Sequence, residues 1–143
     1  MVTFVLDCSA TLPWIFRDET TDDSSRLHDE LIAGAEVWVP ELWHLELGNA
    51  LLVSEKRKRI DQIGIKGFLQ KLQTYRIIVD DETVMRAWNE TLDLAMRYNL
   101  STYDAAYLEL ALRRRLPLAT LDEALAKAAT AAGVPLCLSK KRG

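Results

Sequence analysis

Four acidic residues stand at positions in the sequence where a carboxylate can take part in chemistry. Asp7 ends an apolar run, and Glu46 lies within the apolar stripe of a predicted helix. Asp104 and Asp122 each stand at the start of a further predicted helix. Two like charges about 4 Å apart cost roughly 4 kcal/mol at an effective dielectric constant of about 20, so four carboxylates brought together need protons or a cation. All-oxygen ligands favour a hard ion, and we therefore predict that these four residues bind Mg²⁺ or Mn²⁺.

A hard divalent ion at such a site can activate a water molecule and hold a phosphate oxygen, which is the chemistry of phosphodiester hydrolysis. The sequence offers no competing nucleophile among its histidines, cysteines and lysines, and it has no glycine-rich phosphate-binding loop. Cys8 and Cys137 lie in separate apolar runs with no other metal ligand at suitable spacing. We expect both to be buried free thiols of an intracellular protein.

The predicted elements bring the four acids to one edge of a sheet. We expect strands at residues 2–8, 36–39, 76–80, 116–120 and 134–138. Helices are expected at residues 9–16, 20–33, 41–58, 62–74, 81–98, 102 onward and 123–132. This alternation predicts an α/β protein of three layers, with a central, mostly parallel sheet of four to five strands and helices on both faces. Ligands of such sheets bind beyond the carboxyl ends of the strands, where all four acids can lie.

Details of these elements are also predicted. Ser9 is expected to cap the first helix, and Pro135 places the last strand at an edge. The stripe that contains Glu46 is formed by Leu42, Trp43, Glu46, Asn49, Ala50 and Val53. The core-facing side of helix 81–98 is formed by Val84, Ala87, Trp88, Leu92, Ala95 and Met96.

Each acid also has a purely structural interpretation. Ser101 and Asp104 have the spacing of a capping box, and either Thr120 or Asp122 can cap the helix that follows them. Glu46 can lie at the edge of its stripe and reach water. Four such coincidences at one edge of a sheet are less expected than any single one, which favours the metal site.

The chain of 143 residues is long enough for one domain with a substantial core, and we assign residues 1–138 to that domain. Residues 139–143 form a short basic tail. The net charge of −3, from 18 basic and 21 acidic residues, gives no overall attraction to nucleic acid. No apolar run approaches the roughly 20 residues of a membrane span, and the first residues do not resemble a signal peptide.

The chain resembles a PIN domain of the small bacterial type exemplified by the VapC toxins of toxin–antitoxin pairs. Four blocks carry the resemblance, in order along almost the whole chain. Residues 5–10 (VLDCSA) resemble the first strand and first acid of the family, and residues 40–51 resemble the helix with its second acid. Residues 100–111, with the sequence YDA around Asp104, and residues 119–133, which begin ATLD, resemble its last two acid blocks. Cys8 departs from the family, in which a small Ala or Thr is more usual.

The resemblance implies a Mg²⁺- or Mn²⁺-dependent ribonuclease that cuts single-stranded regions of RNA in the cytoplasm. The residues implied to hold the metal or activate the attacking water are Asp7, Glu46, Asp104 and Asp122. Thr120 and Ser9 would support these acids. We add Asn49 as a supporting residue because it shares the predicted helix face of Glu46.

The family also implies a homodimer and a cognate antitoxin that covers the site, with no role at a membrane. Three consecutive arginines, Arg113, Arg114 and Arg115, and the basic tail are candidates for holding RNA by its phosphates. On the residues alone, these arginines equally suit the C-terminal end of a helix, where positive charge is favourable.

Two other functions remain open. Asp7 can be the phosphate acceptor of a phosphotransferase, although such domains need a second acid close to the first and a lysine after a late strand, neither of which we find. Alternatively, the chain is a catalytically weak or inactive PIN-like module that binds RNA or protein, with its acids serving as helix caps and solvated edges.

Overall fold

The structure is a computed structural model that describes residues 2–138. Its strands are β1 (Phe4–Leu6), β2 (Glu36–Val39), β3 (Arg76–Val79) and β4 (Leu118–Ala119). Its helices are α1 (Cys8–Thr11), α2 (Asp22–Ile32), α3 (Trp43–Lys56), α4 (Gln62–Leu72), α5 (Thr83–Arg86), α6 (Glu90–Tyr98), α7 (Thr102–Arg114) and α8 (Glu123–Ala131). Two short 3₁₀ turns, η1 (Leu12–Trp14) and η2 (Arg17–Glu19), follow α1. The basic tail predicted at residues 139–143 lies outside the described residues.

The four strands form one sheet in the order β3-β2-β1-β4, and every neighbouring pair is parallel. β1 lies inside the sheet, and all three of its residues are fully buried. This agrees with its continuous apolar sequence, since a parallel strand is covered on both faces. The carboxyl ends of the strands share one edge, so Asp7 after β1, Thr120 after β4 and Asp80 after β3 all lie along it.

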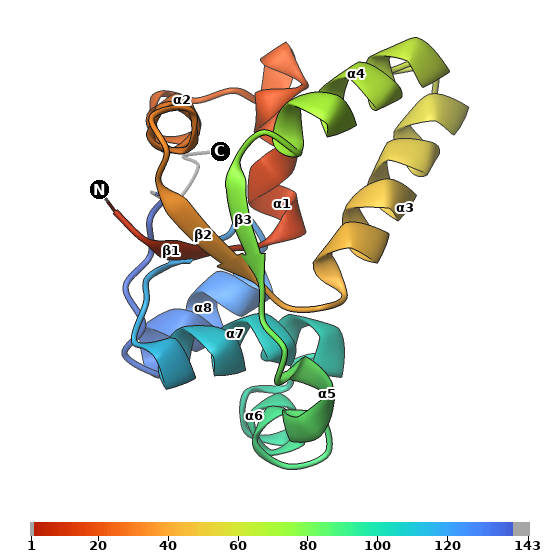
Figure 1. Cartoon of the computed structure of the whole chain (residues 1–143). Helices are drawn as coiled ribbons and strands as arrows, with labels where there is room; N and C mark the ends of the chain where they lie inside the picture. Colours follow the sequence, from red (N-terminus) through yellow and green to blue (C-terminus); the bar gives the residue numbers. More distant parts are fainter. Residues whose placement is uncertain (1, 139–143) are drawn as a thin grey trace.

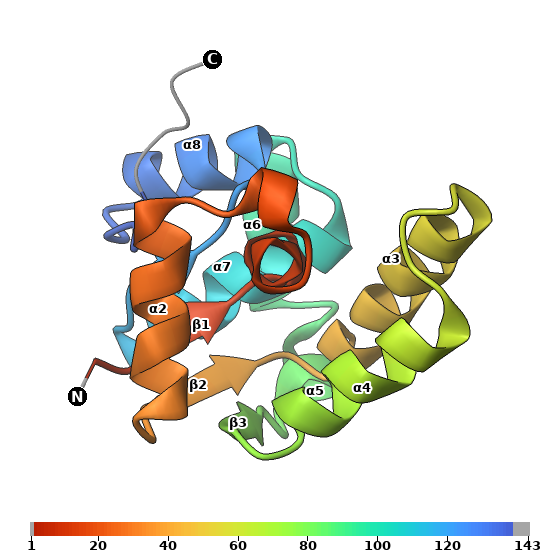
Figure 2. The ribbon, with the colours of Figure 1, turned by 90° about the horizontal axis from the view of Figure 1, so that it is seen from above.

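Helices cover both faces of the sheet. In Figure 1, α1 and α2 lie above the sheet and α7 and α8 lie below it. Figure 2, seen from above, shows α7 behind the strands and shows α3 and α4 as a helical hairpin that extends to one side. The nearly all-apolar helix α7 is in the middle of the fold, and its residues 105–111 are all buried. The predicted three-layer α/β architecture with a parallel sheet is therefore confirmed.

The single helix predicted at residues 81–98 is wrong. The chain forms α5, a turn, and then α6, and Asn89 between them has φ −113° and ψ −104°, outside the helical region. Residues spaced by three or four positions share one face only within one continuous helix. The break at Asn89 therefore separates residues that were predicted to share the core-facing side. Of its members, Trp88 is 88% exposed and Val84 is 73% exposed, whereas Ala95 is buried.

The stripe predicted on the helix with Glu46 is shifted. The buried residues of α3 are Trp43, Leu47, Leu51 and Ser54. Asn49 is exposed, and Glu46 is half-buried at the border of this stripe. The shift arises because Leu47 and Leu51, rather than Ala50 and Val53, continue the core face that starts at Trp43.

The two ends of the domain also differ in detail from the prediction. Residues 134–138 contact β4 through one parallel bridge, between Leu118 and Leu136, and do not extend into a fifth strand. Pro135 has no backbone N–H to lengthen the pairing. At the other end, Asp7 rather than Ser9 is the N-cap residue of α1. No helix within residues 2–138 combines the length and apolar character needed to cross a bilayer.

Candidate metal and catalytic site

Asp7 lies at the centre of the site, held by two hydroxyl groups. The pairing of Leu6 with Ala119 in β1 and β4 places Asp7 beside Thr120. Thr120 Oγ1 donates to Asp7 Oδ2 at 2.8 Å, and Ser9 Oγ donates to the same oxygen at 2.6 Å. Asp7 is only 5% exposed. Burial raises its pKa, the two hydroxyls partly offset this, and the nearby Asp122 raises the pKa further.

The same hydroxyls connect Asp7 to the start of α8. Ser9 Oγ accepts from the Leu121 N–H at 2.9 Å, and Thr120 Oγ1 accepts from the Asp122 N–H at 3.1 Å. Asp122 is the N-cap of α8, and its Oδ2 accepts from the Leu125 N–H at 2.8 Å. The capping interpretation of Asp122 is therefore correct, and it coexists with a place in the acid cluster, because the charge of Asp122 raises the pKa of Asp7.

Asp104 enters the site from the first turn of α7. Ser101 is the N-cap of this helix, and its Oγ accepts from the Asp104 N–H at 3.1 Å. Burial raises the pKa of the Asp104 carboxyl, and the charges of Asp122 and Asp7 raise it further, while Ser101 partly offsets them. The carboxylate is thus close enough to two other acids for their charges to disfavour its ionised form.

Glu46 reaches the site from the first turn of α3. Its Oε1 accepts a hydrogen bond of 2.5 Å from the hydroxyl of Tyr107. Burial raises the pKa of Glu46, the Tyr107 hydroxyl lowers it, and the charges of Asp7 and Asp104 raise it again. Although Glu46 lies at the border of its apolar stripe, as one interpretation of the sequence expected, its carboxylate is bonded inside the protein.

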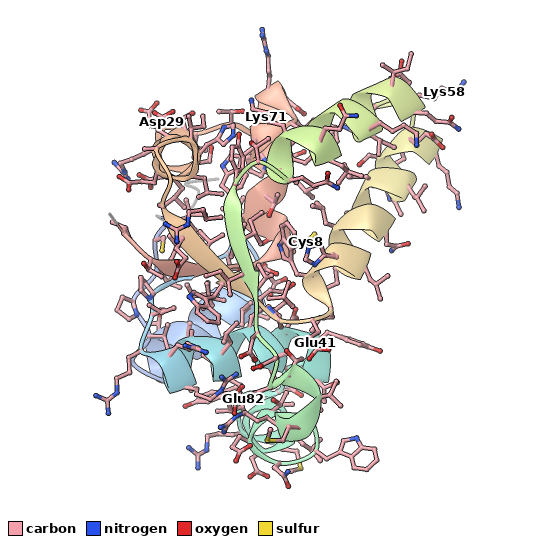
Figure 3. All side chains as sticks on the ribbon, viewed as in Figure 1. Cys8, Asp29, Glu41, Lys58, Lys71 and Glu82 are labelled. Atoms are coloured by element: carbon pink, nitrogen blue, oxygen red, sulfur yellow. The ribbon has the colours of Figure 1, made fainter. Side chains whose placement is uncertain are left out.

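Cys8, the first residue of α1, follows Asp7 directly and lies on the side of α1 that faces α3 (Figure 3). Both cysteines are free, and both are partly rather than fully buried. Burial, followed by the charges of Asp7 and Glu46, raises the pKa of the Cys8 thiol to about 12. A protonated thiol is a poor nucleophile and a poor metal ligand, so the carboxylates are the reactive groups here.

The donor set fits a hard divalent ion. Each of Asp7, Glu46 and Asp104 has a pKa raised in part by the charge of another of the four acids. Within residues 2–138, no Lys, Arg or His side chain forms an ion pair with any of the four. The site therefore concentrates negative charge without a cation of its own, and oxygen ligands of this kind suit Mg²⁺ or Mn²⁺.

The PIN-domain family pattern matches residues 4–131 of the chain. The chain belongs to the PIN-domain family. No curated protein sequence matches it beyond this family pattern.

Solved structures share the PIN fold with this chain. PAE2754 from Pyrobaculum aerophilum superposes with a TM-score of 0.67 at 22% identity, covering 89% of this chain and 84% of that chain. A chain of a toxin–antitoxin complex from Klebsiella pneumoniae has a TM-score of 0.61 at 17% identity, covering 95% and 98%. VapBC2 from Rickettsia felis, bound to a DNA fragment from its promoter, has a TM-score of 0.61 at 14% identity, covering 94% and 97%. At these identities the likeness establishes the fold.

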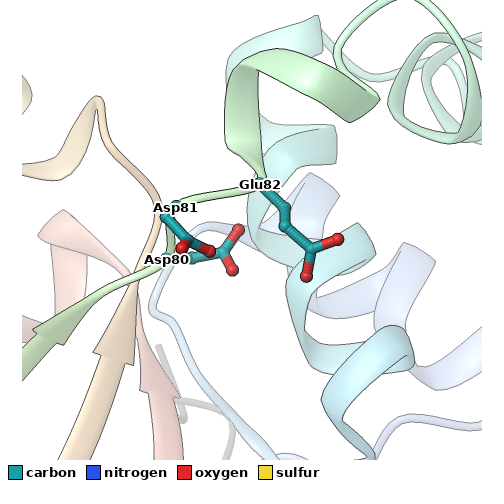
Figure 4. Close-up of side chains that lie close together, drawn as sticks. All are labelled: Asp80, Asp81 and Glu82. Atoms are coloured by element: carbon teal, nitrogen blue, oxygen red, sulfur yellow. The ribbon is translucent and has the colours of Figure 1, made fainter.

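A second acidic group of this PIN domain lies at the end of β3. Within residues 2–138, Asp80, Asp81 and Glu82 are the only group of three acids in which one carboxylate oxygen of each lies within 4.8 Å of the other two (Figure 4). No three of the four predicted acids meet this limit. Arg113 binds Asp80 Oδ2 at 2.7 Å and Glu82 Oε2 at 3.0 Å, and Arg86 binds Glu82 Oε1 at 2.9 Å, so two of these three carboxylates already have cationic partners within the chain.

The three arginines predicted to hold RNA lie at the far end of α7 from Asp104. Arg113 lies nine positions after Asp104, which is about 14 Å along a helix. Arg113 also binds Glu109, at 2.9 Å, so its guanidinium is shared among three carboxylates. Arg114 lies 3.7 Å from the ring centroid of Trp38, and Arg115 is exposed where the helix ends. Arg114 and Arg115 therefore remain available to a phosphate backbone, whereas Arg113 is engaged.

The remaining predicted residue, Asn49, is exposed one turn beyond Glu46, and no hydrogen bond of its side chain is found among the described residues. Sequence reasoning missed Tyr107, the residue that does contact Glu46. A signal was present, because Tyr107 lies three residues after Asp104 on the same helix and is the one polar-tipped side chain of an otherwise apolar run from 105 to 108.

Proposed function

We propose that this PIN domain is a Mg²⁺- or Mn²⁺-dependent endoribonuclease, which hydrolyses phosphodiester bonds of single-stranded RNA as the toxin of a toxin–antitoxin pair. One observation carries the proposal: the acids come from four separate segments to one edge of the sheet, and their charges raise the pKa of Asp7, Glu46 and Asp104. Within residues 2–138, none of the four forms an ion pair with a cationic side chain. Family membership supports a nuclease, and one of the structures with this fold comes from a toxin–antitoxin complex.

The residues that would hold the ion are Asp7, Glu46, Asp104 and Asp122. When bound, a divalent ion supplies an activated water and a partner for a phosphate oxygen. Ser9 and Thr120 fix the orientation of Asp7 through its Oδ2. Among these carboxylates, Glu46 and Asp104 are the candidates that would take the proton of the attacking water.

We further propose a homodimer and an antitoxin that covers the acidic edge, both in the cytoplasm with the RNA substrate. An exposed apolar surface supports association of the chain with another protein. We call it the α5–α6 apolar surface, formed by Val84, Met85, Trp88, Leu92 and Met96. Large apolar side chains exposed together on one segment are typical of protein–protein contacts.

The phosphotransferase alternative loses support. Asp7 accepts from two hydroxyls, and within residues 2–138 no lysine forms an ion pair with any of the four acids. A phospho-acceptor site of the kind considered from the sequence needs a lysine at this edge.

The test is cleavage of a mixed RNA pool by the purified chain, free of antitoxin, with Mg²⁺, with Mn²⁺ and with EDTA. We expect cleavage with either metal, none with EDTA, and a loss of at least about 100-fold in Asp104→Asn, in which a ligand is removed. Asp29→Asn is the matched control, because Asp29 is exposed on α2 and away from the four acids. Cleavage that survives EDTA or Asp104→Asn would contradict the proposal, and RNA that is bound but uncut in every lane would favour the inactive binding module.

A further inference from the structure

We infer that Tyr107 is a positioning residue of the proposed nuclease site, and that its hydroxyl holds the carboxylate of Glu46 among the other acids. The inference rests on the proposed function for the site and adds a residue to it. It concerns the bond between α3 and α7, the two helices that bring Glu46 and Asp104 to the edge of the sheet.

Tyr107 is built into the core. It is 0% exposed and is among the largest fully buried side chains of the protein. Its hydroxyl donates to Glu46 Oε1 at 2.5 Å, across 61 residues of sequence. Since Asp104 lies one turn earlier on the same helix, a rigid buried ring ties the position of Glu46 to the helix that carries Asp104.

Glu46 needs such a tether. Its helix belongs to the α3–α4 hairpin, which extends away from the sheet (Figure 2). The neighbouring Leu45 is 81% exposed, so solvent is within reach of this part of α3. The hydrogen bond from Tyr107 is the one found for the Glu46 carboxylate among the described residues. Without it, a long glutamate side chain can turn to water, where it regains rotamer freedom and hydration.

A phenol suits this task better than a cation. Arginine or lysine at the same place would orient Glu46 but would also neutralise it, and a divalent ion would lose much of its attraction to the site. The Tyr107 hydroxyl orients the carboxylate and leaves its negative charge in place. The ordinary pKa of a tyrosine hydroxyl is about 10, so the hydroxyl keeps its proton near neutral pH and remains a donor.

The test is the affinity of the purified chain for Mn²⁺, measured by titration calorimetry in wild type and Tyr107→Phe. The substitution removes one oxygen and keeps the ring, so the core packing is retained. We expect Tyr107→Phe to bind Mn²⁺ about 10- to 100-fold more weakly, the range typical of residues that orient metal ligands. Tyr98→Phe is the matched control, because Tyr98 is a half-buried tyrosine of α6, and it is expected to bind like wild type.

A Glu46→Ala background separates positioning from a general loss of structure. If Tyr107 acts through Glu46, adding Tyr107→Phe to Glu46→Ala causes no further loss of Mn²⁺ affinity. An equal further loss in that background, or wild-type affinity in Tyr107→Phe alone, would overturn the inference and leave the proposed function intact. A wild-type chain that binds neither Mn²⁺ nor Mg²⁺ would overturn both.

A second measurement needs no variant. In protein labelled with ¹³C at the tyrosine Cζ, Mg²⁺ titration is expected to shift the Tyr107 signal, because its hydroxyl bonds a ligand of the ion, and to leave the Tyr98 signal in place. A Tyr107 signal that does not move while Mg²⁺ binds would overturn the inference.

Discussion

The Thr120 hydroxyl donates a hydrogen bond of 2.8 Å to Asp7 Oδ2 and joins residues that are 113 positions apart in the sequence. The bond follows from the parallel pairing of β1 with β4. Leu6 pairs with Ala119, so the next residues, Asp7 and Thr120, lie side by side. Thr120 also accepts from the Asp122 N–H, so one side chain connects two of the four acids.

Replacing Thr120 by valine keeps the shape of the side chain and removes this hydroxyl. Because Asp7 is buried and then keeps Ser9 as its one side-chain donor among residues 2–138, we expect Thr120→Val to lower the free energy of unfolding by about 1–2 kcal/mol. Urea denaturation of the metal-free chain measures it. Thr130→Val, at an exposed position of α8, is the control and is expected to stay within about 0.5 kcal/mol of wild type. Equal effects of the two substitutions would mean that the bond to Asp7 contributes nothing.

Arg113 gives the largest predicted loss of stability. Its guanidinium compensates Asp80, which is 1% exposed, and Glu109, which is 5% exposed. Removing one partner of a buried ion pair leaves uncompensated buried charge, so Arg113→Ala is expected to cost roughly 3–5 kcal/mol. Circular dichroism during thermal unfolding tests this, with Arg97→Ala, at an exposed position of α6, as the control. If Arg113→Ala instead weakened RNA binding at unchanged stability, its earlier assignment to the RNA surface would be right.

The fold could be predicted because its signals are local. The apolar run before Asp7 predicts a buried parallel strand wherever the rest of the chain lies, and the alternation of strands and helices then leaves few topologies. The helix predicted at residues 81–98 failed for the opposite reason. Nothing in the local sequence from Val84 to Met96 shows that the helix is interrupted at Asn89. The helical spacing, continued past that residue, predicted Trp88 in the core, whereas Trp88 is exposed.

In the candidate site, the positions of the acids could be predicted from the sequence, whereas their hydrogen-bond partners could not. Asp7, Asp104 and Asp122 stand at ends of elements, where their positions follow from the topology alone. The partners of each side chain do not follow from it. The bond from Tyr107 to Glu46 spans 61 residues, and the bond from Arg113 to Asp80 spans 33, so no local pattern in the sequence indicates either bond.

The α5–α6 apolar surface predicts the oligomeric state. Trp88 is 88% exposed, and placing a charge there would oppose burial in any interface. We expect wild type to be a dimer in light scattering after gel filtration, and Trp88→Asp to weaken that dimer at least about 10-fold. Ile63→Asp is the matched control, because Ile63 is 83% exposed on α4, outside this surface. A dimer disrupted by Ile63→Asp and not by Trp88→Asp would move the interface to the α3–α4 hairpin.

His28 predicts how stability changes with pH. It stacks on Trp14 and lies 2.8 Å from the Tyr75 hydroxyl. Burial, and then the charge of Lys71, lowers its pKa in the folded chain. The unfolded chain therefore takes up a proton first as pH falls below about 6.5, and stability present above that pH is lost as pH falls through the folded pKa. We expect the unfolding free energy of wild type to fall more between pH 7.5 and 5.5 than that of His28→Gln. His44→Gln, at an exposed position, is the control, and parallel curves for wild type and His28→Gln would contradict the prediction.

The Asp104 carboxylate is predicted to destabilise the metal-free folded chain and to be needed for metal binding. Burial and the charges of Asp122 and Asp7 raise its pKa, so the folded chain disfavours the ionised carboxylate at neutral pH, and this cost recedes as pH falls below the raised pKa. Asp104→Asn removes the charge and keeps the shape, so the metal-free variant should melt at a higher temperature than wild type. A ligand that binds only the folded state raises the melting temperature, and we expect Mn²⁺ to do so in wild type and in Asp29→Asn but not in Asp104→Asn. A less stable variant that still responds to Mn²⁺ would show that Asp104 serves the start of α7 and takes no part in holding an ion.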